Sequence, residues 1–183
     1  MVESGDWVVP QYEGQPFFDK PILSYWLMAA AMEGLGTTAG AARLVPVLAS
    51  IGVLLATAWL GTLFYDRRSA LWGALVLATT LAFLSFARVA MSDMLLALWT
   101  TLAVGLAVLA YRPGAPSWAV PVLGAVAGLG FATKGPVALL VPGLAVLLLL
   151  WENRRRPLPC GGGPLALGVL AFAVLGLGWF ALV

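Results

Sequence analysis

The sequence predicts an all-α protein, a polytopic bundle of transmembrane helices. Of its 183 residues, 62% are hydrophobic and only 10% are charged, and the mean hydropathy is +0.98. An α-helix needs about 20 apolar residues, within a range of roughly 17–25, to cross a bilayer. The charges leave six uncharged stretches that are long enough, namely residues 44–65, 69–87, 94–111, 113–133, 135–151 and 157–183.

Six transmembrane spans fit these stretches and make residues 44–183 the transmembrane bundle. We place the cores of the spans near residues 44–64, 69–87, 93–111, 117–133, 136–151 and 164–183. The fourth and fifth spans are separated by Gly135-Pro136, directly after Lys134. Proline removes a backbone donor and restricts the residue before it, so we expect the helix to break there.

Residues 1–43 form a separate segment before the first span. Within it, residues 22–35 are apolar but too short to cross a membrane, and such a length is typical of an interfacial helix. Tyr25 and Trp26 suit the headgroup region, where aromatic rings are enriched. We expect a helix over residues 22–35 that lies along the membrane surface and ends at Gly34 and Gly36.

The charges divide unequally between the two sides of the membrane. If six spans alternate, one side receives residues 1–43, 88–93 and 134–135, and the other receives short loops with six arginines. These arginines are Arg67, Arg68, Arg112, Arg154, Arg155 and Arg156. Basic residues in short loops favour the cytoplasmic side. The first side is therefore predicted to be extracytoplasmic, in a multi-pass protein of the inner or plasma membrane.

The composition excludes several kinds of chemistry. The chain has no histidine, so no histidine of this chain serves as a base or a metal ligand. Cys160 is the only cysteine, which rules out a disulfide within the chain. The net charge of +2 is small and its charges are dispersed, and this predicts no nucleic-acid partner.

The few charges on the predicted extracytoplasmic side are the candidates for function, because ionisable groups near a membrane are costly. The pair Asp19-Lys20 lies between Pro16 and Pro21, in a segment expected to be non-helical. A carboxylate beside an ammonium can bind a divalent cation and a phosphate together. A solvated loop pair explains the same two residues equally well.

A second group of candidates surrounds the turn before the third span. Arg88 and Asp93 bracket this turn. Ser92 is expected to cap the next helix, because its hydroxyl can accept hydrogen bonds from free backbone amides. Asp93 can cap as well and still face a substrate, whereas Arg88 suits either an ion pair or a phosphate contact.

Lys134 ends the fourth span within Thr133-Lys134-Gly135-Pro136. A lysine in such a place can simply extend its ammonium to the headgroups. Glycine and proline, however, form a tight turn whose backbone amides can approach an anion. The turn therefore favours an anion site over headgroup contact alone.

Several motifs taken together resemble one family. They are Glu3-Ser4-Gly5-Asp6-Trp7-Val8-Val9-Pro10, Phe18-Asp19-Lys20-Pro21, Tyr25-Trp26, Arg43, Ser92-Asp93 and Thr133-Lys134-Gly135. In this order they resemble the bacterial lipid-phosphate-dependent glycosyltransferases related to protein O-mannosyltransferases and to lipid A aminoarabinose transferase. The resemblance covers essentially the whole chain and implies a multi-helix GT-C membrane fold. It also implies sugar transfer from a polyprenyl-phosphate carrier to a lipid, glycan or protein acceptor on the extracytoplasmic face.

Matched motif by motif, the resemblance implies roles for individual residues. Lys20 and Lys134 are implied to contact the carrier phosphate, and Arg88 and Tyr25 are further candidates for substrate or phosphate binding. Asp93 is implied to be a catalytic acidic residue of the site. Asp19 stands where relatives often have a glutamate that is associated with a divalent metal, the one cofactor that the resemblance suggests.

The resemblance further implies that part of the active site lies outside this sequence. In the family, an Asp-Glu pair upstream of the Ser4-Gly5-Asp6-Trp7 run supplies the proposed catalytic base. The chain begins at Met1, after that pair, and stops at Val183 inside an apolar stretch. We therefore expect an internal fragment, or a coding sequence begun at the wrong Met, that binds a lipid phosphate but does not transfer sugar alone.

The favoured function is an integral-membrane glycosyltransferase, or a part of one. The first alternative is a transporter or flippase of lipid-linked sugars, which predicts broken helices with ionisable residues near the bilayer midplane. Charges at the ends of the spans favour the enzyme instead. The second alternative is a non-catalytic membrane scaffold, which stays open because the proposed base is not in the chain.

Overall fold

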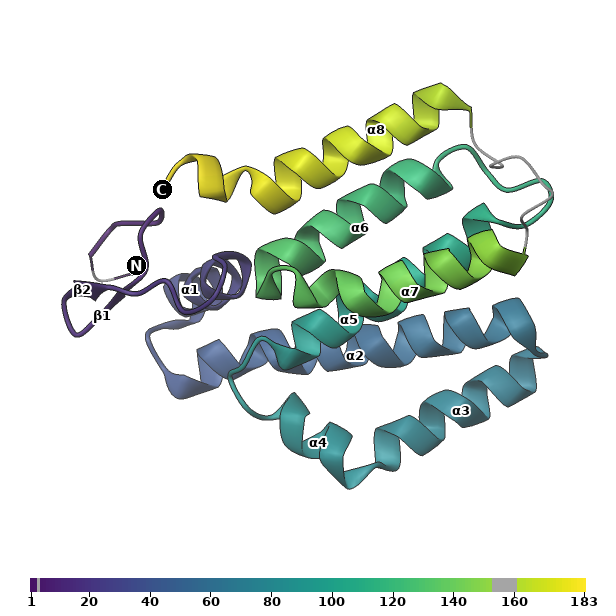
Figure 1. The fold of residues 1–183 in the computed structure, drawn as a ribbon. Coiled ribbons are helices and arrows are strands. Elements are labelled where there is room, and N and C mark those ends of the chain that lie inside the picture. Colours follow the sequence, from purple (N-terminus) through teal and green to yellow (C-terminus); the bar gives the residue numbers. More distant parts are fainter. Residues whose placement is uncertain (3, 153–160) are drawn as a thin grey trace.

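The computed structural model describes residues 1–2, 4–152 and 161–183, and helices dominate it (Figure 1). The helices are α1 (Leu23–Leu35), α2 (Ala39–Phe64), α3 (Arg67–Thr79), α4 (Leu81–Ala87), α5 (Asp93–Ala110), α6 (Ala119–Lys134), α7 (Val137–Glu152) and α8 (Gly162–Phe172). Helix α8 continues into a π-helical turn, η1 (Ala173–Leu177), and a 3-10 turn, η2 (Trp179–Ala181). The predicted helical bundle is confirmed.

The long helices lie side by side, and successive passes of the chain run in opposite directions (Figure 1). Helix α2 packs against α5, α5 against α6 and α7, and α6 against α8. The starts of α5 and α7 therefore lie at the same end of the bundle as the end of α6, beside both chain termini. The connection between α2 and α3 and the one between α5 and α6 lie at the opposite end. This is the alternation that the sequence predicted.

The described helices differ in how well they could cross a membrane by themselves. By length and composition, α2 and α5 are each long and apolar enough, and α3 and α4 qualify only if the bent pair counts as one span. Helices α6 and α7 and the stretch Gly162–Leu177 are apolar but shorter. The last three therefore stay predicted spans, whereas the structure supplies helices in all six places. Arg154, Arg155 and Arg156, which are predicted to lie in a cytoplasmic loop, are outside the described residues.

The prediction of one continuous helix over residues 69–87 is wrong. Helices α3 and α4 meet at an angle of 69°, because Thr80 has an extended backbone with ψ 126°. The hydroxyls of Thr79 and Thr80 donate hydrogen bonds to the carbonyl of Val76 at 2.9 Å and 3.0 Å. Hydroxyls that bond to carbonyls at a helix end satisfy groups that the helix leaves free, so the break costs little in apolar surroundings.

Capping side chains explain why two helices begin earlier than expected. Thr38 accepts a hydrogen bond from the amide of Ala41 at 3.2 Å and starts α2 at Ala39, so that Arg43 lies inside the helix. Asp66 accepts from the amides of Arg68 and Ser69 at 2.9 Å and 3.2 Å and starts α3. Such N-caps satisfy the free amides of a first turn.

A short β-hairpin precedes α1 and was not expected from the sequence. Strands β1 (Gln11–Tyr12) and β2 (Gln15–Pro16) pair antiparallel. The two residues between them, Glu13 and Gly14, have φ values of 51° and 76°. Two positive φ angles are what a tight two-residue hairpin requires, and the pair Glu-Gly was the signal for it.

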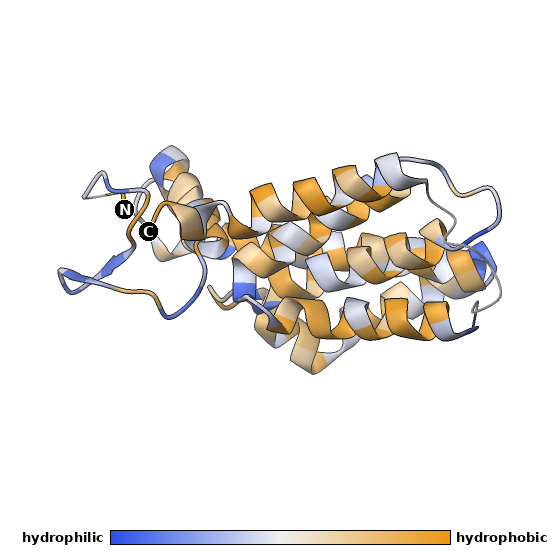
Figure 2. Ribbon diagram, turned by 45° about the horizontal axis from the view of Figure 1, so that its top comes forward, coloured by the Kyte–Doolittle hydropathy of each residue, from blue (hydrophilic) through white to orange (hydrophobic). Residues whose placement is uncertain are grey.

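Helix α1 confirms the helix expected over residues 22–35. Gly34 lies within it, and it ends at Gly36, whose φ is 90°. In both ribbon views α1 runs across the end of the bundle instead of along it (Figures 1 and 2). Figure 2 also shows hydrophilic residues at this end and at the opposite end of the bundle, with apolar residues along the helices between them. This placement suits an interfacial helix.

Glycines allow α6 and α8 to approach closely. A Cβ atom added to Gly124 would collide with the backbone carbonyl of Gly168, and one added to Gly176 would lie 3.2 Å from Gly128 Cα. Small residues permit such contacts between membrane helices, where packing replaces the hydrophobic driving force. The contact holds the last helix, and with it Trp179, against the rest of the bundle.

We therefore predict that Gly124→Ala destabilises the bundle, because the obstacle is backbone and cannot rotate away. The expected loss is about 1–3 kcal/mol, the usual effect of overpacking. Gly143→Ala in α7 is the matched control, since a Cβ atom there meets no atom of the described residues within 4 Å. Unfolding by denaturing detergent measures both. Equal stability of the two variants would contradict the packing described for α6 and α8.

Candidate functional site

Asp93 and Lys134 occupy opposite kinds of helix terminus at the same end of the bundle. Asp93 is the first residue of α5, and Lys134 is the last residue of α6. The helix dipole favours an anion at an N-terminus and a cation at a C-terminus, so each charge is stabilised by its own helix. Because α5 and α6 are antiparallel neighbours, the two termini meet.

The two side chains form an ion pair. Lys134 Nζ donates a hydrogen bond to Asp93 Oδ1 at 2.6 Å. The side chain of Lys134 is 31% exposed and that of Asp93 is 35% exposed, so a ligand can reach both groups. Two residues separated by 41 positions in the sequence thus converge, as the counting of spans predicted.

The loop Asp19-Lys20-Pro21 adjoins this ion pair. It is non-helical, as predicted. A Cβ atom built on Gly135 would lie 3.9 Å from Pro21 Cγ, and Gly135 directly follows Lys134. Lys20 Nζ lies 4.0 Å from the carboxylate of its neighbour Asp19. The two lysines of the chain are therefore carried by segments that touch each other.

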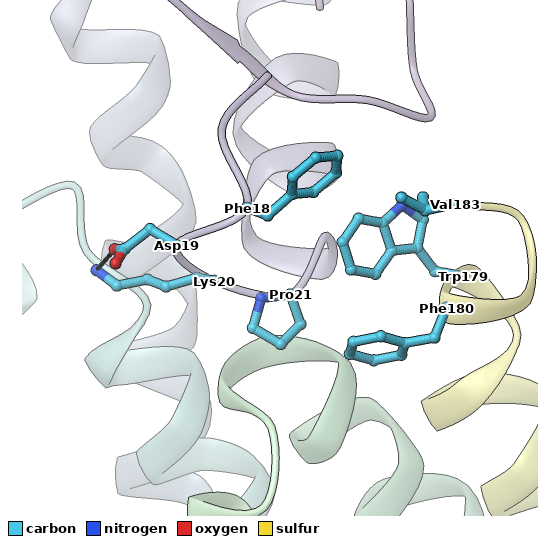
Figure 3. A pocket seen from close by; sticks show the side chains of 7 residues that line it. All are labelled: Phe18, Asp19, Lys20, Pro21, Trp179, Phe180 and Val183. Carbon is cyan, nitrogen blue, oxygen red and sulfur yellow. Dashed lines mark ion pairs between the residues drawn. The ribbon is translucent and has the colours of Figure 1, made fainter. Parts of the chain in front are cut away.

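A cavity of about 360 Å³ opens beside this loop (Figure 3). It is lined by Phe18, Asp19, Lys20, Pro21, Trp179, Phe180 and Val183. Figure 3 shows the rings of Phe18, Trp179 and Phe180 gathered on one side, whereas Asp19 and Lys20 point away on the other side of Pro21. An apolar wall next to a charged group suits a ligand with an anionic head and a hydrocarbon tail.

Two indole N–H groups attach the N-terminal segment to the bundle. Trp26 Nε1 donates to the carbonyl oxygen of Trp7 at 2.6 Å. Trp179 Nε1 donates to the carbonyl oxygen of Val8 at 2.8 Å and so joins residues 171 positions apart. These bonds fix the segment between α1 and η2, next to the loop that carries Lys20.

Asp6 organises the same segment from within. Its Oδ1 accepts hydrogen bonds from the amides of Val8 and Val9 at 2.9 Å and 3.0 Å. The bond from Val9, followed by that from Val8, lowers the pKa of Asp6 below its ordinary value of 3.8. The charged Asp6 carboxylate therefore stabilises the turn at any pH above 3.8, its ordinary pKa. This stabilisation is lost as the pH falls through the lowered pKa. Residues 4–10 therefore have a structural role.

Sequence reasoning missed Trp179. The span over residues 164–183 predicts only an apolar residue at this position, yet Trp179 is 7% exposed and its indole N–H bonds to the N-terminal segment. The available signal was an aromatic pair, Trp179-Phe180, at one end of a sequence whose first forty residues hold a second group of aromatic residues. Its partner is a backbone carbonyl, so no pairing of residue types revealed the contact.

Tyr25 lies in a different cavity from Lys20. This second cavity, of about 480 Å³, is lined by Met1, Val2, Tyr25, Met28, Ala29, Met32, Thr37 and Ala42. Burial, and then the negative charge of Asp19, raise the pKa of Tyr25. The two cavities share no lining residue. The predicted contact between Tyr25 and a substrate stays a prediction.

Ser92 behaves differently from what was expected, and the predicted phosphate contact of Arg88 stays a prediction. Arg88 caps the end of α4 and is exposed, and within the described residues it forms no ion pair. Ser92 precedes α5, but its side chain caps no amide. Its hydroxyl is buried without a hydrogen-bond partner in the described part of the chain. The prediction that Ser92 caps α5 is wrong, because its backbone is helical, with ψ −5° instead of the extended angle of an N-cap.

The described residues do not assemble a metal site around Asp19. Across residues 1–2, 4–152 and 161–183, no three histidine, cysteine or acidic side chains lie close enough to hold one ion. The Asp19 carboxylate is 59% exposed and faces the ammonium of Lys20. A divalent cation usually takes several oxygen ligands, so no step below depends on one.

The helical bundle, with the ion pair where α5 begins and α6 ends, defines a class of membrane protein with a charged site at the ends of its helices. Similarity to known proteins identifies the family. The profile of the family described as dolichyl-phosphate-mannose-protein mannosyltransferase matches residues 19–179. The chain therefore belongs to this family, as the resemblance of its motifs predicted.

Individual relatives agree with this membership. An undecaprenyl phosphate-alpha-4-amino-4-deoxy-L-arabinose arabinosyl transferase of Yersinia enterocolitica is 31% identical over an alignment of 183 positions, which covers 98% of this chain and 33% of that protein. A second, from Sodalis glossinidius, is 32% identical over an alignment of 185 positions, which covers 98% of this chain and 32% of the relative. The chain thus spans about a third of the length of these relatives.

A solved structure shows the same fold. The crystal structure of ArnT from Cupriavidus metallidurans bound to undecaprenyl phosphate superimposes with a TM-score of 0.87 at 26% identity, over 100% of this chain and 34% of that one. The apo crystal structure of the same protein gives a TM-score of 0.85. The expected GT-C membrane fold is confirmed.

Proposed function

We propose that this chain forms the phosphate-binding part of an integral-membrane glycosyltransferase. It would move a sugar from a polyprenyl-phosphate carrier to a lipid, glycan or protein acceptor. The observation that carries the proposal is the Asp93–Lys134 ion pair beside the Lys20 loop. The names of the relatives, and the undecaprenyl phosphate in the neighbouring crystal structure, support a lipid-phosphate donor.

The two lysines stabilise the leaving group in this proposal. When the bond between sugar and carrier breaks, negative charge develops on the departing lipid phosphate. Ammonium groups fixed next to that phosphate stabilise the transition state. Lys134 and Lys20 lie at the polar end of the bundle, and the apolar wall of Phe18, Trp179 and Phe180 offers a place for the first carbons of the lipid.

The carrier phosphate competes with Asp93 for Lys134. A phosphate group offers several charged oxygens to an ammonium, whereas Asp93 offers one accepting oxygen in the observed pair. Once Lys134 turns to the phosphate, the carboxylate of Asp93 loses its partner and can accept a hydrogen bond or a proton from the acceptor. Donor binding would thus prepare Asp93 for its part in transfer.

The location of the charges favours this function over transport. A transporter of lipid-linked sugars would place ionisable groups near the middle of interrupted helices. The ion pair lies instead at the ends of α5 and α6. The bent α3–α4 pair is an interrupted helix, but its break at Thr80 carries hydroxyl groups and no charge.

Competition predicts opposite effects of two substitutions on the binding of undecaprenyl phosphate in lipid nanodiscs. Asp93→Asn should raise the affinity about tenfold, because Lys134 no longer has to leave a charged partner. Lys134→Met should lower it by about the same factor. Asp93→Asn in the Lys134→Met protein should then have little effect.

In a transfer assay with the intact membrane protein, Asp93→Asn should lower the rate by about 10²–10⁴-fold.

Arg112→Ala is the matched control, since Arg112 is exposed and lies at the opposite end of the bundle. It should leave both binding and transfer unchanged. Unchanged affinity in both Asp93→Asn and Lys134→Met would refute the proposed competition. Full transfer activity of Asp93→Asn would refute the catalytic role of Asp93.

The proposal also places the site on the extracytoplasmic face of the membrane. The arginine count supports this orientation. Single cysteines at positions 67 and 90, in a protein with Cys160→Ser, should react with an impermeant thiol reagent from opposite sides. Position 90 should react from the outside, because it lies in the turn that leads to Asp93. Reaction of both positions from the same side would refute the proposed orientation of the site.

A further inference from the structure

A partly buried hydrogen-bond chain connects α5 to α6 near the ion pair. Trp99 Nε1 donates to Thr133 Oγ1 at 3.1 Å, and Thr133 Oγ1 donates to the carbonyl oxygen of Leu129 at 2.8 Å. The side chain of Thr133 is completely buried. The Trp99 N–H and the Thr133 hydroxyl thus both have hydrogen-bond partners. Such a satisfied network in an apolar interior favours one arrangement of the helices over its neighbours.

Close packing supports the same contact. A Cβ atom added to Gly130 would lie 3.3 Å from Trp99 Cβ and 3.3 Å from Ala138 Cβ. The missing side chain of Gly130 therefore lets α5 and α7 approach α6 at this level. Trp99 also packs against the clusters around Met94 and around Leu106. The indole is held on several sides, so its N–H has a fixed direction.

The hydrogen-bond chain lies next to the charges. Thr133 immediately precedes Lys134, and Trp99 follows Asp93 by six residues, or about 9 Å along α5. Sliding one helix past the other by a single residue would shift it by about 1.5 Å and rotate it by about 100°. A shift of that size would break the 2.6 Å contact between Lys134 and Asp93. The ion pair thus needs a device that fixes the register of the two helices.

We infer that Trp99 and Thr133 are positioning residues that hold α5 and α6 in the register required by Asp93 and Lys134. Neither residue needs to touch the substrate. The structural part of this inference stands on the contacts alone, and its consequence for catalysis rests on the proposed function. It assigns a role to the threonine of Thr133-Lys134-Gly135 that is separate from anion binding.

The test uses the two lysines of the chain, Lys20 and Lys134. Acetic anhydride acetylates free amines, and an amine held in an ion pair reacts more slowly. The ratio of acetylation at Lys134 to that at Lys20, measured by mass spectrometry in nanodiscs, therefore reports the Asp93–Lys134 pair without any substrate. Asp93→Asn should raise this ratio about twofold to fivefold, as expected for a partly exposed pair, and calibrates the assay.

Two substitutions remove the hydrogen bond: Thr133→Val keeps the shape of the side chain, whereas Trp99→Phe also removes one ring of the indole. Trp99→Phe removes the indole N–H, and Thr133→Val replaces the hydroxyl with a methyl group. Both should raise the acetylation ratio by a large part of the Asp93→Asn effect, and combining either with Asp93→Asn should add nothing. Thr133→Ser keeps the hydroxyl and should retain the wild-type ratio.

Thr100→Val is the matched control on the same helix. Among the described residues, the hydroxyl of Thr100 bonds only within α5, to the carbonyls of Leu96 and Ala97, so its loss should leave the ratio unchanged. If Thr133→Val does not fold, Trp99→Phe alone decides the result. A wild-type ratio in Trp99→Phe would overturn the inference. A raised ratio together with unchanged affinity for undecaprenyl phosphate would leave the inference intact and count against the proposed function.

Discussion

The ion pair between Asp93 and Lys134 joins α5 to α6 at the end of the bundle that also carries α1 and both chain termini. Each charge is stabilised by the dipole of its own helix and by its partner. The close approach at Gly130 and the bond from Trp99 to Thr133 bring these helix ends together. Pro21 against Gly135 then adds the loop of Lys20. A site for an anionic lipid follows from the way in which the helices pack.

Much of this arrangement was predictable from the sequence. Charges interrupt the apolar stretches at few positions, and counting the stretches placed Asp19, Lys20, Asp93 and Lys134 on one side. The break at Gly135-Pro136 was predictable because proline ends a helix, and the structure confirms it with a φ of 66° at Gly135. The bend at Thr80 was not, because threonine hydroxyls can satisfy helix carbonyls either within a straight helix or at a break.

The indole contacts were beyond sequence reasoning for a different reason. Trp26, Trp99 and Trp179 donate to atoms far away in the sequence, and two of these acceptors are backbone carbonyls that any residue provides. Composition suggested a headgroup role for Trp26, whereas the structure gives its N–H a defined protein partner. The motif around Asp6 and Trp7 resembled a family signature, and its physical role as an anchored turn became evident only from these bonds.

The central claim is that the carrier phosphate takes Lys134 from Asp93. A structure of the intact membrane protein in a lipid bilayer with a bound polyprenyl phosphate tests it most directly. We predict phosphate oxygens within about 4 Å of both Lys134 Nζ and Lys20 Nζ, the usual limit of an ion pair, and an Asp93–Lys134 distance longer than the 2.6 Å seen here. A phosphate bound elsewhere, with the 2.6 Å contact intact, would contradict it.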